Sequence, residues 1–164
     1  MSQVLSRVIE VCIFKMVGGS PLYLMLHRSA NDPLYPGLWQ IVTGMLEDNE
    51  HSVGGALRET REETGLTPAR CWIAPYVDTF YSASSDTVHL SPFFAMQVRE
   101  NDEPRLSSEH QAYEWLLREA AESRLVWPGQ KRGLKLVHEY VVGGLPGGTL
   151  TEVTNLAQFE RKKS

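Results

Sequence analysis

Residues 44–66 read GMLEDNEHSVGGALRETREETGL, and this stretch decides how the whole chain is interpreted. Glu59, Glu62 and Glu63 are spaced i, i+3 and i+4, so in a helix that turns about 100° per residue they project from one face. Like charges at this spacing repel each other unless a cation gathers them. The pattern therefore predicts a helix with a metal site on one face.

The residues around these carboxylates follow the pattern G-x5-E-x7-R-E-U-x-E-E-x-G-U, where U is a bulky aliphatic residue. Gly44, Glu50, Arg58 and Gly65 occupy the other fixed positions. With this pattern the chain resembles the Nudix hydrolases, which cleave nucleoside diphosphates linked to another moiety. Thr60 stands where that family usually has Ile, Leu or Val. We expect it to face the core with its hydroxyl bonded to the preceding turn.

A solvated, charged helix is the alternative interpretation of the same stretch. In that case Arg58 would form an ordinary ion pair with Glu62 at i+4, as most such charge runs do. This interpretation accounts for neither of the flanking glycines nor for Glu50, so we favour the metal site.

Composition indicates one domain and limits the partners. A chain of 164 residues with 42% hydrophobic residues can bury one substantial core. Residues 44–66 hold six acids and two bases, a balance of -4 that equals the net charge of the chain, so the remainder is neutral. Polymeric nucleic acid is disfavoured, because it needs clustered Lys and Arg. A small polyphosphate bridged by Mg²⁺ fits an acidic site.

The N-terminal apolar run predicts a strand and no membrane segment. Residues 8–17 are interrupted by Glu10 and Lys15 and are too few to cross a bilayer. Cys12 and Cys71 lie in apolar, strand-like runs, which is typical of buried thiols in a reducing compartment. We expect a cytoplasmic protein without membrane contact.

The order of predicted elements is mixed α/β, with helices packed on a mixed sheet. The predicted strands cover residues 7–17, 22–28, 39–43, 71–81 and 87–98, and the predicted helices cover 52–64, 117–124 and 127–142. Because their connection is short, we expect the last two strands to pair as an antiparallel hairpin, and we expect residues 29–38 to form the rim of a pocket. Ser52 is expected to cap the motif helix and Gly65 to end it.

Two glycines inside the motif helix are unusual. Gly54 and Gly55 each cost about 1 kcal/mol relative to Ala in a helix interior. We therefore expect another backbone, or the phosphate-binding loop, to approach the helix closely there.

The resemblance implies an α/β/α sandwich in which the motif forms a loop, a helix and a loop. We assign residues 1–142 to a Nudix hydrolase domain and residues 143–164 to an appended segment. This segment starts with GGLPGG and ends in a basic run, and we expect it to be disordered or to dock on a partner.

Hydrolysis of a phosphoanhydride requires an activated water and neutralised phosphoryl charge, for which Mg²⁺, or Mn²⁺ in its place, is suited. The expected carboxylate ligands are Glu59, Glu62 and Glu63, and the resemblance adds the Gly44 carbonyl. Arg58 would orient one of the carboxylates, and Glu50 would support the junction between loop and helix.

Residues 107–116, SSEHQAYEWL, contain a further candidate. The resemblance makes Glu109 a metal ligand or general base on a loop facing the metal, against the alternative of a surface glutamate. A lone histidine such as His110 is more often solvated or structural.

Substrate residues follow from the closest resemblance. WQIVTG (39–44), LMLHR (24–28) and the EHQAYEW segment are similar to dihydroneopterin triphosphate pyrophosphatases and related nucleoside triphosphate pyrophosphohydrolases. This implies substrate contacts for Arg28 and Thr43, and a phosphate contact for Arg7. Aromatic candidates for stacking on the ring are Tyr35, Tyr81 and Phe93, for which a core position is the alternative.

The predicted activity is Mg²⁺-dependent cleavage of a nucleoside or pterin triphosphate to the monophosphate and pyrophosphate. Hydrolysis of dinucleoside polyphosphates such as diadenosine tetraphosphate ranks second, because those enzymes usually have Pro-Lys-Gly where this chain has Val42-Thr43-Gly44. A non-catalytic Nudix-fold binding module is the third alternative, although such modules are expected to have lost motif carboxylates. A homodimer is left open.

Overall fold

A computed structural model describes residues 1–160 of the chain. The strands are β1 (Gln3–Leu5), β2 (Val8–Val17), β3 (Ser20–Arg28), β4 (Trp39–Gln40), β5 (Val42–Met45), β6 (Arg70–Ser82), β7 (Thr87–Gln97) and β8 (His110–Leu116). The helices are α1 (Ser52–Thr64), α2 (Arg118–Arg124), α3 (Pro128–Leu136) and α4 (Pro146–Leu150), with the π-helix η1 (Val137–Val142) and the 3₁₀-helix η2 (Leu156–Phe159).

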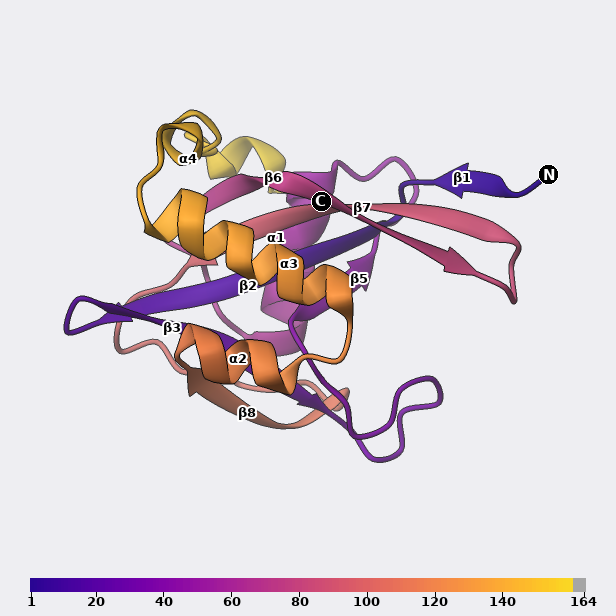
Figure 1. Cartoon of the computed structure of the whole chain (residues 1–164), viewed down its shortest axis with the longest axis horizontal. Helices are drawn as coiled ribbons and strands as arrows, with labels where there is room; N and C mark the ends of the chain where they lie inside the picture. Colours follow the sequence, from indigo (N-terminus) through magenta and orange to yellow (C-terminus); the bar gives the residue numbers. More distant parts are fainter. Residues whose placement is uncertain (161–164) are drawn as a thin grey trace.

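The sheet is mixed and is organised around β2. The strand order is β1-β7-β2-β3-β4, with β5 added on β2, β6 on β7 and β8 on β3. The β1–β7 and β2–β7 pairs are parallel, whereas the other pairs are antiparallel. The expected antiparallel pairing of the two later strands is confirmed as β6–β7, which projects from the body of the molecule (Figure 1).

Helices cover both faces of the sheet, α1 on one side and α2 and α3 on the other (Figure 1). Successive side chains of a strand point to opposite faces, so β2 supplies both layers. Ile9, Val11 and Ile13 join the cluster that includes residues of α1, and Cys12 and Phe14 join the cluster that includes residues of α3. This arrangement confirms the mixed α/β sandwich.

Some predicted boundaries were wrong. The strand expected at 39–43 is divided into β4 and β5, and β8 was not expected as a strand. Its residues are mostly half-buried and become a strand only by pairing with β3. The cap of α1 is His51, whose Nδ1 accepts a hydrogen bond from Val53 N–H at 3.2 Å, rather than Ser52. Gly65 ends the helix in the left-handed conformation, as expected.

Thr60 is fully buried, as expected, but its hydroxyl bonds elsewhere. It donates to Met96 Sδ on β7 at 3.3 Å instead of to the preceding turn. Thr60, the departure from the motif pattern, therefore places a hydroxyl group in the core, where it is hydrogen-bonded to Met96.

The described part of the appended segment, residues 143–160, packs against the rest of the chain. Val153, Leu156 and Phe159 contact the core cluster on the α1 side. A Cβ built on Gly54 would lie 2.9 Å from the carbonyl oxygen of Phe159, which is the close backbone approach expected for the helix glycines. At Gly55 the close neighbour is instead a side chain, that of Leu46. The basic run at 161–163 lies outside the described residues.

None of the described helices has the length and apolar character needed to cross a membrane.

Candidate metal and catalytic site

Arg58 is the centre of the polar network on α1. Its Nε and Nη2 bond both oxygens of Glu50, at 2.9 and 2.8 Å, and its Nη1 bonds Glu59 at 2.8 Å and Glu62 at 2.9 Å. Nη2 also donates to the Met45 carbonyl at 2.9 Å. The bidentate pair with a nearly buried Glu50 fixes α1 to the loop that precedes it, so the predicted orienting role of Arg58 has a geometric basis.

Gly44 and Glu59 are in direct contact across the β5–α1 interface. A Cβ on Gly44 would lie 2.1 Å from the Glu59 Cδ atom. Any larger residue would displace this carboxyl group, so the motif glycine keeps the backbone of β5 against the carboxylates of α1.

Glu63 is the most unusual carboxylate of the three. It is 2% exposed, and among the described residues no side chain donates a hydrogen bond to either oxygen, although the Thr43 backbone N–H lies near enough to favour its charged form. Burial, together with the charges of Glu109 and Glu59, raises its pKa well above the ordinary value. His110 Nε2 lies 3.5 Å from Glu63 Oε2, but burial lowers the His110 pKa to about 4, so the imidazole is neutral near pH 7. A buried carboxylate that forms no ion pair with a Lys or Arg among the described residues fits a cation ligand.

The loop before β8 brings Glu109 to the same place. Ser107 N–H donates to the Glu63 carbonyl at 3.1 Å, and Ser29 N–H donates to the Glu109 carbonyl at 2.8 Å. Glu109 is exposed, and its charge contributes to the raised pKa of both Glu63 and Glu59. The fold thus brings Glu109 near the three carboxylates of α1, although the four candidate residues come from two separate stretches of sequence.

The side chains of these carboxylates do not converge on a common metal position. No three His, Cys, Asp or Glu side chains converge as a cation cage within residues 1–160. Arg58 holds Glu59 and Glu62 by one oxygen each. The donor set, all oxygen and partly solvent-accessible, nevertheless fits Mg²⁺, which binds through a few carboxylates and keeps several waters.

Arg28 lies beside the carboxylates, beneath α1. It pairs with Asp32 and donates to Gln40 Oε1 at 3.1 Å, and Gln40 in turn contacts His110 at 3.3 Å. Its positive charge opposes the rise in the pKa of Glu63. Sequence reasoning missed Asp32, which lies within the loop 29–38 that it marked as a pocket rim, and Gln40, which lies two residues after that loop.

Of the other predicted substrate residues, Thr43 lies next to the carboxylates, since its backbone favours the charged form of Glu63. Thr43 precedes Gly44 on β5 and is half-buried. Tyr35 is 43% exposed and stands edge-on against Trp127, with ring centroids 5.2 Å apart. Of the aromatic alternatives, Phe93 is fully buried in the core and Tyr81 is exposed on the projecting hairpin.

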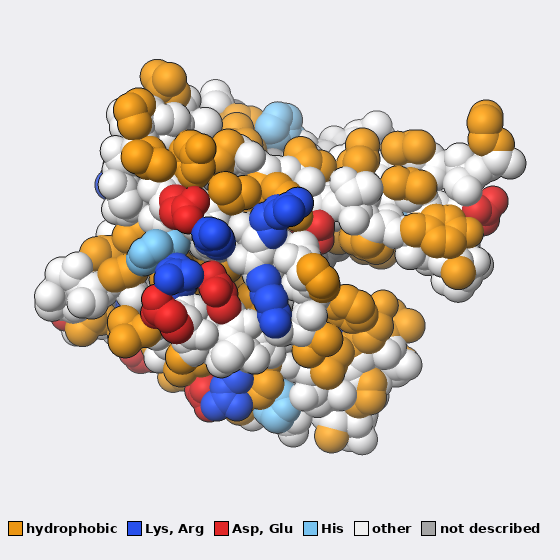
Figure 2. Space-filling view, in the orientation of Figure 1, with side chains coloured by type: hydrophobic (Ala, Val, Ile, Leu, Met, Phe, Trp, Pro, Cys, Tyr) orange, Lys and Arg blue, Asp and Glu red, His pale blue; other side chains and the backbone are white. Residues whose placement is uncertain are grey.

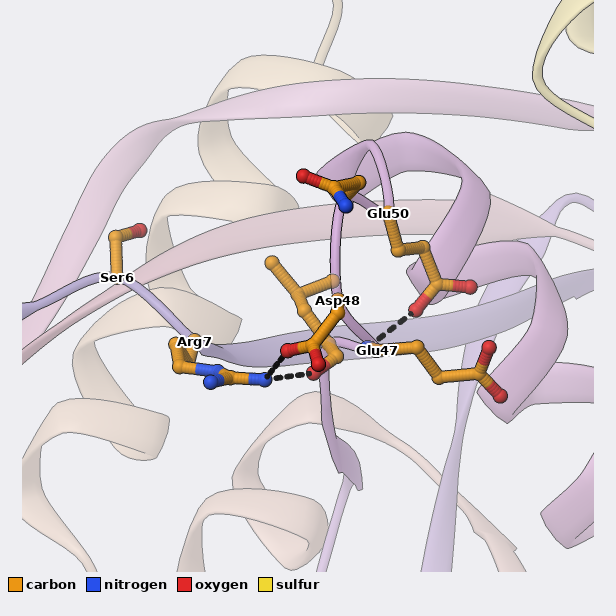
Figure 3. A pocket seen from close by; sticks show the side chains of 7 residues that line it. Ser6, Arg7, Glu47, Asp48 and Glu50 are labelled. Carbon is orange, nitrogen blue, oxygen red and sulfur yellow. Dashed lines mark hydrogen bonds and ion pairs between the residues drawn. The ribbon is translucent and has the colours of Figure 1, made fainter.

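Arg7 lines a pocket of about 260 Å³ together with the loop 46–50 (Figure 3). Its guanidinium binds Asp48 Oδ1 at 2.7 Å and the Leu46 carbonyl at 3.3 Å. Glu47 and Glu50 line the same pocket, so Arg7 lies among acidic side chains.

The family comparison agrees with this geometry. The model of the NUDIX domain matches residues 6–140. An octanoyltransferase of Myxococcus xanthus is 31% identical over 136 residues, which are 79% of this chain but 36% of that protein. The chain therefore spans about a third of that relative. The mouse asymmetrical bis(5'-nucleosyl)-tetraphosphatase is 32% identical over 108 residues, which are 63% of this chain and 71% of that protein.

Solved structures show the same fold. A C. elegans Ap4A hydrolase binary complex superposes with a TM-score of 0.70 at 21% identity, covering 85% of this chain and 99% of that one. The E. coli dihydroneopterin triphosphate pyrophosphohydrolase gives 0.65 at 23% identity with the same coverage. The motif, the fold and the match over residues 6–140 lead to one conclusion: the chain belongs to the Nudix family of hydrolases.

Proposed function

We propose that this protein is a Mg²⁺-dependent pyrophosphohydrolase that cleaves a nucleoside or pterin triphosphate to the monophosphate and pyrophosphate, with Mn²⁺ able to replace Mg²⁺. The observation that carries the proposal is the buried Glu63 carboxylate, which no side chain of the described residues hydrogen-bonds and whose pKa is raised by burial and by the charges of Glu109 and Glu59. A solvated charged helix offers no reason to bury such a group.

Each side chain has a proposed role. Glu59, Glu62 and Glu63 on α1, Glu109 and the Gly44 carbonyl would hold the cation, which when bound supplies charge neutralisation for the phosphoryl oxygens and a more acidic water. Arg58 holds Glu59 and Glu62 in place before the cation arrives. Retention of every motif carboxylate favours catalysis over a binding-only module.

Glu109 is proposed to accept the proton of the attacking water. It is exposed and lies on the loop beside β8, so it can reach solvent as well as the carboxylates of α1. Arg28 and Thr43 would contact the substrate, Tyr35 would pack against its ring, and Arg7 would approach a phosphate once released from Asp48.

The second candidate function is hydrolysis of dinucleoside polyphosphates. The observation in its favour is the 32% identity with the mouse bis(5'-nucleosyl)-tetraphosphatase. The two functions differ in substrate and products but use the same carboxylates, so only a direct comparison separates them.

A substrate panel with Mg²⁺ tests the proposal. Nucleoside and pterin triphosphates and diadenosine tetraphosphate are assayed for pyrophosphate, orthophosphate and mononucleotide. We expect triphosphates to release pyrophosphate. A kcat/KM for diadenosine tetraphosphate that is about tenfold higher, equivalent to about 1.4 kcal/mol of transition-state preference, would select the second candidate.

Metal removal is the second test. Excess EDTA should abolish turnover while the domain stays folded, and Ca²⁺ should support turnover poorly because its geometry is looser than the octahedral arrangement of Mg²⁺. Full turnover in EDTA would refute the metal role.

The proposed setting is a cytoplasm, with a small nucleotide or pterin polyphosphate as partner and neither membrane nor polymeric nucleic acid involved. A homodimer remains a hypothesis, which light scattering tests directly.

A further inference from the structure

Charged side chains at the surface of this protein are paired, whereas Glu63 in its interior is not. On the face covered by α2 and α3, Lys and Arg side chains lie among Asp and Glu side chains at the surface (Figure 2). Arg118 and Glu122, for example, pair at 2.9 Å and both keep contact with solvent. Glu63 is almost without solvent contact and forms no ion pair with a Lys or Arg among the described residues. A feature of the fold must therefore keep it unpaired.

A buried network of polar side chains, the Gln40 network, connects the loop after β3 with Glu63. Asp32 in that loop pairs with Arg28 at the end of β3, and Arg28 Nη1 donates to Gln40 Oε1 of β4 at 3.1 Å. Gln40 Nε2 lies 3.3 Å from His110 Nε2, and the same His110 nitrogen lies 3.5 Å from Glu63 Oε2. Gln40, His110 and Glu63 are each 5% exposed or less, so these contacts are shielded from bulk water.

Arg28 fixes the direction of the hydrogen bonds in the Gln40 network. A guanidinium donates and cannot accept, so the amide oxygen of Gln40 faces Arg28 and its NH₂ group faces His110. An amide NH₂ group cannot accept either. His110 Nε2 must therefore present a lone pair to Gln40. A ring with a lone pair on Nε2 is neutral and carries its proton on Nδ1.

The other tautomer of His110 would serve Glu63 and leave Gln40 unsatisfied. With its proton on Nε2, the ring would direct an N–H at Glu63 Oε2 but also at the Gln40 NH₂ group, and two donors repel each other. The contact with Gln40 is the shorter one, and no side chain of the described residues hydrogen-bonds Glu63. His110 Nδ1 has no partner among these residues in either tautomer, so it does not decide between them.

We propose that Gln40 is a positioning residue of the metal site: oriented by Arg28, it keeps the proton of His110 away from Glu63 and so leaves this carboxylate to a cation. The inference rests on the metal role of Glu63 in the proposed function. A buried N–H donor on Glu63 would stabilise the carboxylate in the absence of metal, and a cation would then gain less by binding. The Gln40 network thus accounts for a buried carboxylate that has a histidine beside it and receives no hydrogen bond from it.

The position of the His110 proton tests the inference without metal or turnover. Long-range ¹H–¹⁵N correlation spectra of the full chain in EDTA, near neutral pH, show which ring nitrogen carries the proton, and His110→Phe assigns the signals. We expect the wild-type proton on Nδ1. In Gln40→Met we expect it on Nε2, because Met fills a similar space without a donor. A wild-type ring with its proton on Nε2 would overturn the inference.

Cation affinity gives a second test, in the form of a double-mutant cycle. Mn²⁺ alone is titrated into the wild type, Gln40→Met, His110→Phe and the double variant, and free Mn²⁺ is followed by electron paramagnetic resonance. Substitutions around metal ligands typically weaken metal binding by roughly 10–100-fold, so we expect a loss of about tenfold or more in Gln40→Met. His110→Phe removes the competing donor, so in that background Gln40→Met should have little effect.

Gln97→Met is the matched control for the cycle. Gln97 is a half-buried glutamine at the end of β7, opposite Phe14 and Arg70 in the sheet, and it is not part of the Gln40 network. This variant should bind Mn²⁺ like the wild type. Thermal melts in EDTA confirm that each variant is folded, and the wild-type spectrum tests the inference even where a variant does not fold.

Unchanged Mn²⁺ affinity in Gln40→Met, or an equal loss with and without the His110 ring, would overturn the inference, because Gln40 would then act only through packing. If the proton lies on Nδ1 and the cycle shows coupling but no triphosphate is hydrolysed, the inference stands and the proposed function fails. If triphosphates are hydrolysed while the wild-type ring carries its proton on Nε2, the proposed function stands and the inference fails.

Discussion

The carboxyl groups of this protein differ mainly in their solvent exposure, and that difference decides their chemistry. Glu62 has a side chain that is 59% exposed and paired with Arg58, whereas Glu63, one residue further, is buried and forms no ion pair with a Lys or Arg among the described residues. Desolvation therefore acts on Glu63 far more than on Glu62. The metal-free protein has an unfavourable charge at this point, which a bound cation would relieve.

Replacing Glu63 with Gln should separate stability from function. The amide keeps the shape and removes a buried negative charge that Glu59 and Glu109 repel, so the melting temperature in EDTA should rise or stay level. Pyrophosphate release should fall by several orders of magnitude, because a ligand is lost. Glu62→Gln, at an exposed position, should leave the melting temperature in EDTA unchanged. An active Glu63→Gln enzyme with lower metal-free stability would reject the metal cluster.

Glu10 gives a pH dependence of the free energy of unfolding. Its pKa is raised to about 7, so between pH 4.5 and 7 the folded chain holds a proton that the unfolded chain has released. Stability due to this group therefore falls as pH rises through that window and is constant above it, a loss on the order of 3 kcal/mol. Denaturant unfolding should be measured from pH 4.5 to 8. The free energy of unfolding of Glu10→Gln, relative to that of the wild type, should increase with pH up to about pH 7. A difference in free energy of unfolding between variant and wild type that stays constant over this pH range would contradict the prediction.

At the scale of elements, α1 is held from three sides. Arg58 ties it to the loop before it, Gly44 allows β5 to pack against it, and the backbone of Phe159 lies over Gly54. Arg61 also pairs with Glu160. The segment after residue 143 thus restrains the helix that carries the candidate ligands.

Gly54→Ala tests the contact between Gly54 and the Phe159 carbonyl, because its effect on stability should differ with and without the C-terminal segment. In a helix without tertiary contacts, Ala is favoured over Gly by up to about 1 kcal/mol. In the full chain the new Cβ would be 2.9 Å from the Phe159 carbonyl oxygen, so we expect that gain to disappear and residues 156–159 to lose hydrogen-exchange protection. In a chain that ends at residue 154 the same substitution should raise the melting temperature. A similar gain in both chains would show that the contact has no energetic weight.

At the scale of the whole molecule, the candidate site is assembled from elements that are far apart in sequence. The loop before β8 reaches α1 through the Ser107–Glu63 backbone bond, and this contact brings Glu109 to the carboxylates. Pairing of β8 with β3 holds the loop there.

Glu109→Gln should lower kcat by roughly 100-fold or more, with little change in KM, if Glu109 is a base or a ligand. Steady-state kinetics from pH 6 to 9 provide the measurement. Glu114→Gln, on the same strand region but paired with Arg124 at the surface, should leave the rate unchanged. Identical rates for wild type and Glu109→Gln across that pH range would show that Glu109 is a surface residue without a catalytic role.

The sequence by itself determined the parts of this protein that depend on local spacing. The i, i+3, i+4 carboxylates predicted α1 and its charged face, apolar runs bounded by turn residues predicted β2, β3, β6 and β7, and Gly65 predicted the end of the helix. These features need only the periodicity of helices and strands, which a linear pattern contains.

Only the tertiary structure decided what depends on contacts between distant residues. It made a strand of residues 110–116, placed Phe159 over Gly54, and buried Glu63 with no hydrogen bond from a side chain of the described residues. It also turned Glu10, which in the sequence only interrupts an apolar run, into the neighbour of Gln130, 120 residues away. Burial and pairing across such separations are properties of packing, and no local pattern specifies them.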